Sequence, residues 1–319
     1  MNPHLKGSLA GMLSAAFYGC SPALALLLYA LDFDAANALL YRYFCALILM
    51  LPLLILWKRE QLSLPLQDLK NLALPGICFA LSTLFYFISF NFMNAGISAT
   101  ILFLYPIFTA LIMVLVYHEK ISFAIVLAII LSFGGVVLLH GAEEGGMSPI
   151  GTALAVASAL TYALYIVGIN WVKIIISNEK LTFYLILFSV LTSGLYIAFA
   201  PGTSLKIPTH GQELLIIFLL GLVPTIFSLE LLNVAIANIG STMSAVLGAL
   251  EPVTAVFLSV IIFHEELSFN LVLGIALILL GVLIVIGSQR FKAVRVPKII
   301  RRVNQLIFQR PHRRWRWKS

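Results

Sequence analysis

Three charged side chains stand inside long apolar runs of this sequence: Arg42, Glu230 and Glu251. A charge in the middle of a bilayer costs about 2.5–3.5 kcal/mol even on lenient insertion scales, so such a residue usually faces a partner or a cavity. Glu251 stands about 12 residues from the end of its run, which places it near the midplane of a membrane. A carboxylate at this depth can bind a cationic amine or exchange a proton. The alternative is a paired or protonated carboxyl that only holds its helix in place.

A proline directly follows the midplane glutamate. Pro252 removes one backbone donor from its helix and kinks it, which leaves free carbonyl groups that could line a path for a solute. Pro106 has the same place in an earlier apolar run, where Tyr105 stands instead of the glutamate. The two runs therefore place different chemistry at one level, and both prolines are predicted to kink their helices.

The other two charges lie nearer the ends of their runs. Arg42 stands about seven residues into its run, between Tyr41 and Tyr43. A long arginine side chain at this depth is predicted to snorkel to the membrane surface, with the tyrosines as an interfacial belt. The alternative is that Arg42 reaches inward toward Glu251. Glu230 is predicted to face either the inner mouth of a cavity or a polar neighbour.

The elements that position these residues must lie in a membrane. Apolar residues make up 61% of the 319-residue chain and charged residues 10%, whereas soluble domains have about 45–50% and 25%. This composition excludes a soluble globular enzyme and a disordered or fibrous chain. One crossing needs about 20 mainly apolar residues, so that ten such runs predict ten transmembrane helices. The runs lie at 7–31, 36–57, 70–92, 97–117, 122–140, 150–172, 182–200, 213–236, 242–263 and 269–287.

Basic residues are distributed unevenly over the connections between these runs. If the amino terminus is inside, 18 of the 20 Lys and Arg residues fall on the inner side and only Lys206 on the outer side. Because Lys and Arg are retained in the cytoplasm, both termini are predicted to be cytoplasmic. Eleven of these residues belong to the segment 289–319, which is predicted to be an amphipathic helix on anionic lipid or, alternatively, an unstructured basic arm. No nucleic-acid partner is expected.

The sequence repeats itself after 146 residues. ATILFLYPIFTALIMVLVYHEKISF (99–123) aligns with AVLGALEPVTAVFLSVIIFHEELSF (245–269), and a weaker match at an offset of 144 pairs Tyr18 with Tyr162. Each copy holds five predicted helices. Because five is odd, the second copy must enter the membrane from the opposite face, an arrangement typical of secondary transporters. A duplicated helical bundle without a transport role is the alternative.

The offset of 144 also pairs two Asn-x-Gly segments. Asn94 and Gly96 follow the third predicted helix, and Asn238 and Gly240 follow the eighth. Asn and Gly are common in tight turns because they tolerate a left-handed backbone. Both segments are therefore predicted to form the turn between two neighbouring helices of their copy.

These features resemble a known family, the drug/metabolite transporter superfamily, EamA type. Its signature is a five-plus-five duplication with a proline in the middle of helices 4 and 9 and a glutamate 13 residues later. In this chain the signature residues are Pro106, Glu119, Pro252 and Glu265. The resemblance covers residues 7–288 and implies an all-α integral membrane fold, with one five-helix repeat in 1–141 and an inverted one in 142–288. It further implies a multi-pass protein of a cell's inner membrane, with a central cavity between helices 1, 3, 4, 6, 8 and 9.

The implied cavity selects candidate substrate-binding residues, which are carboxylates and tyrosines on its helices, and the two prolines are candidate gates. The substrate-binding candidates are Glu251, Tyr18, Tyr86, Tyr105, Tyr162 and Glu230, and the gating candidates are Pro106 and Pro252. Aromatic residues at helical spacing also serve as core packing, which is the alternative for each tyrosine.

Three kinds of function fit a duplicated membrane bundle. The resemblance implies secondary transport of small metabolites, and we expect an exporter of amino-acid-like or drug-like solutes that works by alternating access. An intramembrane enzyme would need clustered catalytic groups at one depth. A passive channel would need a ring of carbonyls or charges, but the two copies differ at their central level. Transport is the interpretation that we favour.

No cofactor, metal ion or catalytic residue is expected. The sequence has no GxxxxGK[ST] loop for ATP, and its three cysteines lack the spacing of a metal site. Transport against a substrate gradient would need an ion such as a proton, with Glu251 or Glu230 as its carrier. The expected partners are a small-molecule substrate, a proton and membrane lipids.

Overall fold

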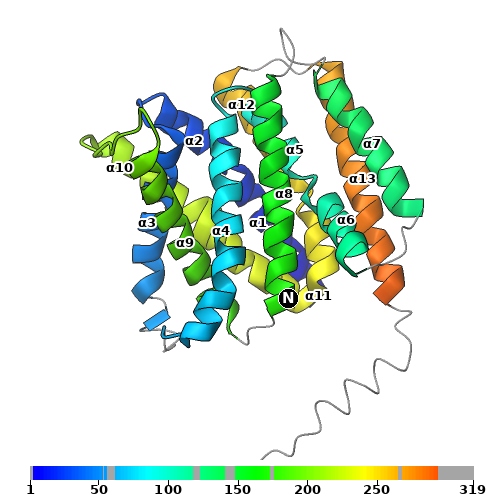
Figure 1. Ribbon diagram of the computed structural model, residues 1–319. Coiled ribbons are helices and arrows are strands. Elements are labelled where there is room, and N and C mark those ends of the chain that lie inside the picture. Colours follow the sequence, from blue (N-terminus) through cyan, green and yellow to red (C-terminus); the bar gives the residue numbers. More distant parts are fainter. Residues whose placement is uncertain are drawn as a thin grey trace, which may run out of the picture.

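The computed structural model describes residues 3–52, 54–55, 62–117, 123–140, 148–172, 176–264 and 268–293, and over these ranges the regular structure is helical throughout (Figure 1). The helices of the first copy are α1 (Pro3–Gly19), α2 (Ser21–Tyr29), α3 (Ala35–Pro52), α4 (Leu66–Ser89), α5 (Ala95–Leu102), α6 (Tyr105–Tyr117) and α7 (Phe123–His140). Those of the second copy are α8 (Pro149–Val172), α9 (Asn178–Phe199), α10 (Gly211–Gly221), the π-helical turn η2 (Leu222–Phe227), α11 (Ser228–Leu247), α12 (Leu250–Phe263) and α13 (Phe269–Ala293). Glu119, Glu265 and the predicted lipid-binding segment from 294 onward lie outside the described residues.

Seven helical segments of the described chain are long and apolar enough to cross a bilayer. They are Pro3–Tyr29, Ala35–Pro52, Leu66–Ser89, Ala95–Met113, Pro149–Ile169, Asn178–Phe199 and Gly211–Ile236, and three shorter apolar helices are Val126–Leu139, Leu250–Phe263 and Phe269–Ile284. The prediction of an all-α integral membrane protein is therefore confirmed. The count of ten spans and the cytoplasmic side of the termini stay predictions.

Several spans are interrupted immediately before a proline. The ring of a proline clashes with the carbonyl group four residues earlier and supplies no N–H group, so regular helical bonding is lost ahead of it. α5 ends at Leu102, four residues before Pro106, and the break between α11 and α12 begins at Gly248, four residues before Pro252. Both interruptions stand where the two prolines predict a kink. Their part in gating stays a prediction.

The turn predicted between the third and fourth helices of each copy forms differently in the two copies. Asn94 caps α5, because its Oδ1 accepts the backbone N–H groups of Gly96 at 2.7 Å and Ile97 at 3.2 Å. Asn238 instead lies inside α11, where its side-chain amide donates to the carbonyl oxygen of Val234 at 2.7 Å. That bond lies along the helix, so Asn238 does not cap a following helix as Asn94 does.

The chain nevertheless reverses its direction within α11. The Cβ atoms of Ala235 and Leu247 both lie within 3.5 Å of the point that a Cβ atom on Gly11 would occupy. A straight helix would hold two residues with this separation in sequence about 18 Å apart. α11 therefore bends back on itself, and both of its arms pack against α1.

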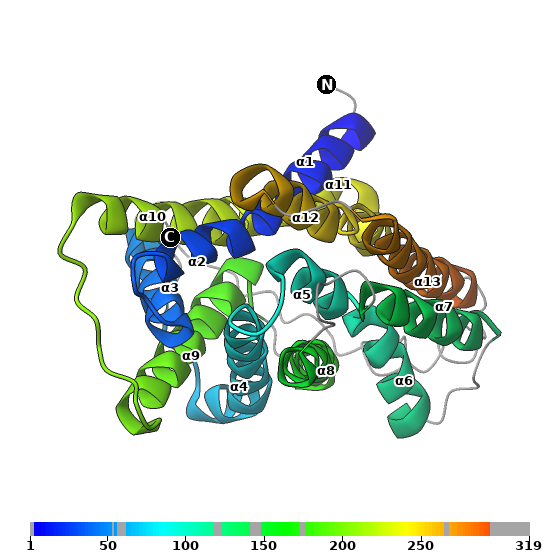
Figure 2. The same ribbon diagram turned by 90° about the horizontal axis from the view of Figure 1, so that it is seen from above.

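The packing of the helices follows the repeat. α4 lies along α8 as α1 lies along α11, and α7 pairs with α13, as both views of the molecule show (Figures 1 and 2). In the α7–α13 pair, a Cβ atom on Gly135 would stand 2.7 Å from the carbonyl oxygen of Gly274. Only glycine permits this approach of two backbones, which is a common way to join helices in membranes.

Two equivalent serine pairs join the copies. The hydroxyl groups of Ser14 and Ser228 each donate to the carbonyl oxygen of the other residue, at 2.7 and 3.0 Å. Ser158 and Ser82 exchange the same two bonds at 2.7 and 2.9 Å. Ser158 follows Ser14 by 144 residues and Ser228 follows Ser82 by 146, the two offsets of the repeat. The same contact is thus built twice, each time between a helix of one copy and a helix of the other.

Ser158→Ala is expected to lower the free energy of unfolding by about 0.6 kcal/mol and by no more than about 1.7 kcal/mol, the average and the maximum measured for interhelical hydrogen bonds in a membrane. Denaturant titration of the full chain in bicelles measures this change. Ser189→Ala is the matched control, since among the described residues the buried Ser189 hydroxyl bonds only to the carbonyl oxygen of Leu185 in its own helix, at 2.9 Å. An equal loss in both variants would mean that the bond between copies adds nothing to stability.

Candidate functional site

A cavity of 130 Å³ lies between the two copies and is lined by residues of α1, α5, α6, α8, α11 and α12. Four of the six predicted binding residues line it: Tyr18, Tyr105, Tyr162 and Glu251. The sequence repeat pairs the first of these tyrosines with the third, and the second with the glutamate. Residues that are equivalent in the two copies therefore line the cavity in pairs. One of these pairs is unequal, with a tyrosine in the first copy and the carboxylate of Glu251 in the second.

Glu251 is placed in the cavity by the break ahead of α12. It stands in the first turn of that helix, where the helix dipole favours a negative charge. α1 passes directly behind it, because a Cβ atom on Gly19 would stand 2.6 Å from the carbonyl oxygen of Glu251. Among the residues that the structure describes, none makes a hydrogen bond or ion pair with its carboxylate. The nearest influences on it are electrostatic, from Arg42 and from the neighbouring tyrosines.

An aromatic cluster, which we call the aromatic wall, consists of Phe79, Tyr105, Tyr162 and Tyr165. Tyr105 and Tyr162 line the cavity that holds Glu251, and Phe79 and Tyr165 continue the cluster beyond that lining. The ring centroids of Tyr105 and Tyr162 are 4.7 Å apart, those of Tyr162 and Tyr165 5.4 Å, and those of Phe79 and Tyr165 5.2 Å. The pairs meet edge to face, the arrangement that the ring quadrupoles favour. This wall can receive an apolar group or, on a ring face, a cation.

Arg42 does not reach the membrane surface, so the prediction that it snorkels outward is wrong. Its side chain is only 2% exposed. Nη1 donates to Ser21 Oγ at 2.7 Å, and Nε donates to Thr225 Oγ1 at 3.0 Å. Both hydroxyl groups come from helix irregularities beside a proline: Ser21 begins α2 just before Pro22, and Thr225 follows Pro224 in η2. These two acceptors draw the guanidinium inward.

A second cavity of 210 Å³ adjoins the first and shares Tyr18 and Tyr162 with it. Arg42 lines this cavity in the interior of the molecule. Asn178 and Asn233, whose side chains meet at 3.4 Å, line it at the predicted cytoplasmic end. The two cavities together make a continuous set of lining residues from that end to Glu251.

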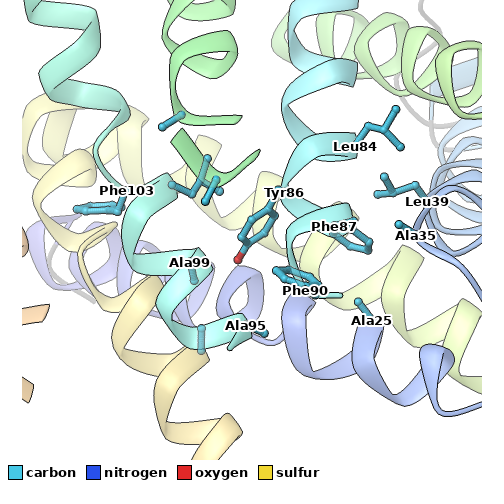
Figure 3. Packing of buried hydrophobic residues seen from close by; sticks show 14 of the residues in the cluster. Ala25, Ala35, Leu39, Leu84, Tyr86, Phe87, Phe90, Ala95, Ala99 and Phe103 are labelled. Carbon is cyan, nitrogen blue, oxygen red and sulfur yellow. The ribbon is translucent and has the colours of Figure 1, made fainter. Parts of the chain in front are cut away.

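The opposite, predicted outer end of this region is filled by packed side chains. Figure 3 shows Tyr86 and Phe87 of α4, with Phe90 directly after that helix, between the small residues of α5 and those of α2 and α3. Phe87 is completely buried, and its carbonyl oxygen accepts a hydrogen bond from Tyr29 Oη at 2.9 Å. We call this group, with Tyr29, the outer cluster.

Two predicted binding residues lie outside the lining of both cavities. Tyr86 is 2% exposed and belongs to the outer cluster, with its ring centroid 4.7 Å from that of Phe90. Its hydroxyl group points from α4 toward α5 (Figure 3) and interacts electrostatically with Glu251. Glu230 is half-buried in the first turn of α11 and lines neither cavity.

Sequence reasoning missed Ser21, Thr225 and Phe79. A hydroxyl residue next to a proline, as in Ser21-Pro22 and Pro224-Thr225, was the available signal for the first two. The repeat was the signal for Phe79, because the offset of 146 pairs it with Thr225.

Comparisons with known proteins agree with this architecture. A family model described as "EamA-like transporter family" matches residues 5–141 and again 149–287. No curated protein matches the chain. A solved structure described only as "Crystal structure of protein" is 20% identical, with a TM-score of 0.63 over 91% of this chain and 98% of that one, and so supports the fold alone. The resemblance inferred from the sequence is confirmed, because the family model covers nearly all of both copies. The chain is a member of the EamA-like transporter family, within the drug/metabolite transporter superfamily.

Proposed function

We propose that the protein is a secondary transporter that exports small amino-acid-like or drug-like metabolites by alternating access. Family membership makes it a transporter of the drug/metabolite type. The observation that carries the finer proposal is Glu251, a carboxylate without a protein partner among the described residues, in a cavity that both copies line. A cavity of this kind at the interface of two repeats is where secondary transporters bind their solutes.

The inverted orientation of the two copies is part of the proposal. Two similar units with opposite orientations give two conformations of similar energy, one open to each side of the membrane. The cavity residues run toward Asn178 and Asn233, while the outer cluster fills the other end. This supports a state that is open to the cytoplasm. The interruptions ahead of Pro106 and Pro252 are the proposed gates.

Glu251 is the better candidate for carrying a coupling proton. It lines the cavity, whereas Glu230 does not. We propose an inner-membrane location with both termini in the cytoplasm, where the basic segment 289–319 would contact anionic lipid.

Uptake into everted membrane vesicles tests the function directly. Vesicles that carry the full chain should accumulate members of a panel of labelled amino acids and amphiphilic amines above vesicles without it. Preloading with the same unlabelled solute should accelerate entry, because a carrier exchanges solutes across the membrane and a passive channel does not. Entry without acceleration would favour the channel, and chemical conversion of a solute without its movement would favour an intramembrane enzyme.

A further inference from the structure

Arg42 keeps donors free although it is buried. A guanidinium has five N–H donors, and only the bonds to Ser21 and Thr225 engage Arg42 within the described ranges. No carboxylate of those ranges stands within ion-pair distance of it. Its charge is instead surrounded by rings, with Cζ at 5.8, 5.2 and 5.6 Å from the ring centroids of Tyr18, Tyr43 and Phe87. Arg42 belongs to the lining of the 210 Å³ cavity.

Tyr43 provides a second, independent sign of a missing ligand. Its side chain is 2% exposed, and its hydroxyl group is one of the few buried polar groups in the described chain without a hydrogen-bond partner. Buried polar groups are nearly always paired, so an exception calls for an explanation. Tyr43 lines the same cavity as Arg42. A buried cation and a buried hydroxyl donor with unused capacity share the features of an oxyanion site.

Arg42 and its two hydrogen-bond partners, Ser21 and Thr225, are matched by aromatic residues at the equivalent positions of the repeat. At the offsets of the repeat, the counterparts of Arg42, Ser21 and Thr225 are Phe188, Tyr165 and Phe79. Two of these counterparts belong to the aromatic wall. A symmetric fold thus carries an asymmetric cavity, with charged and hydroxyl groups on one side and rings on the other.

We infer that Arg42 and Tyr43 bind the carboxylate of an amphoteric solute whose ammonium group is held by Glu251 and whose apolar part lies on the aromatic wall. This inference rests on the proposed transport function and names its substrate class, an apolar α-amino acid or a close analogue. Tyr18 lines both cavities and stands beside Arg42, so it adjoins both charged subsites. The planar fork of arginine matches a carboxylate with two parallel hydrogen bonds.

Three probes separate the charges of such a solute: L-phenylalanine carries both, phenethylamine lacks the carboxylate, and 3-phenylpropionate lacks the amine. Proteoliposomes with the full wild-type chain should transport phenylalanine better than either single-charge probe. Arg42→Gln should raise the KM for phenylalanine at least about 30-fold, in keeping with the loss of one partner of a buried charge pair, and affect phenethylamine much less. Arg42→Lys, which keeps the charge but not the fork, should fall between wild type and Arg42→Gln.

Tyr43→Phe is the variant least able to disturb the fold, since it removes a hydroxyl without a protein partner. It should raise the KM for phenylalanine about 3–10-fold, the value of one hydrogen bond, and leave the Tm unchanged or higher. Tyr41→Phe is the matched control, because Tyr41 lies on α3 outside both central cavities.

The outcomes distinguish this inference from the proposed function. Equal losses for phenylalanine and phenethylamine in Arg42→Gln and in Tyr43→Phe would overturn the carboxylate subsite and leave Arg42 as a charge that balances Glu251, with transport intact. Wild-type transport of phenethylamine but not of phenylalanine would also overturn it. Transport of no probe and of no panel solute above empty liposomes would overturn both proposals.

Discussion

Glu251→Gln is expected to lower transport of an amine-bearing solute about 100-fold, because removing one partner of a buried charge pair loses about 2–5 kcal/mol of binding. The two side chains have nearly the same shape, so the cavity should keep its form. Since the described residues give the carboxylate no bond to lose, the thermal stability in detergent should stay the same or rise. Initial rates in proteoliposomes, together with the Tm of the purified variant, measure both effects.

The control for this variant is Glu213→Gln. Glu213 is a second buried glutamate, but its carboxylate accepts the backbone N–H groups of Thr209 and His210 at 2.6 and 3.0 Å at the start of α10. Its replacement should weaken the cap of α10 and lower the Tm, with little effect on KM. Transport at the wild-type rate in Glu251→Gln would remove Glu251 from the mechanism.

The same variant separates two roles of Glu251. If the carboxylate binds the amine, both uphill accumulation and exchange of solute across the membrane are lost. If it only carries a proton, accumulation in a proton gradient is lost, while exchange between equal internal and external concentrations continues. Our proposal of a bound ammonium group requires the first result.

Gly19→Ala is expected to reduce transport at least about 10-fold and to lower the free energy of unfolding by about 1–3 kcal/mol, as for an overpacked core. The added Cβ atom would stand 2.6 Å from the carbonyl oxygen of Glu251 and 2.7 Å from Thr254 Cβ. Neither atom belongs to the free end of a flexible side chain, so α12 must move away from α1. Because Glu251 lies in the first turn of α12, its carboxylate moves with the helix.

Gly134→Ala is the matched control. The nearest atom to its added Cβ would be Leu277 Cδ1 at 4.0 Å, an ordinary contact, and alanine favours a helix more than glycine does. Transport assays and thermal unfolding of both variants test the contrast. If Gly19→Ala behaved like Gly134→Ala, the close approach of α1 and α12 would not exist in the membrane.

The sequence predicted those features that depend on composition and position along the chain. The cost of a charge in lipid singled out Glu251, and the repeat singled out Tyr18 and Tyr162, and all three line the cavity. Depth follows from counting residues along a helix. The depth of Glu251 therefore needed only its place in the run, and the cost of a charge in lipid indicated that it faces a cavity or a partner.

The sequence could not predict which way a side chain points when the neighbouring helices were unknown. Arg42 has the right depth to snorkel, but hydroxyl groups from two distant irregularities, at Ser21 and Thr225, hold it inside. Tyr86 and Glu230 stand on the expected spans yet lie outside the lining of both cavities. The side chain of Asn238 donates to Val234 of its own helix. Whether an asparagine bonds in this way or caps the next helix depends on the local path of the backbone and not on residue type.

The hydrogen bonds of the serine pairs restrict which helices can move relative to one another. Each pair ties a helix of the first half to a helix of the second, α1 to α11 and α4 to α8. A motion that pulled the amino-terminal half away from the carboxy-terminal half as two blocks would break all four bonds at once. Under the proposed alternating access, a motion that keeps these bonds would slide the α1–α11 block past the α4–α8 block, with its boundary inside each half of the sequence and not between the halves.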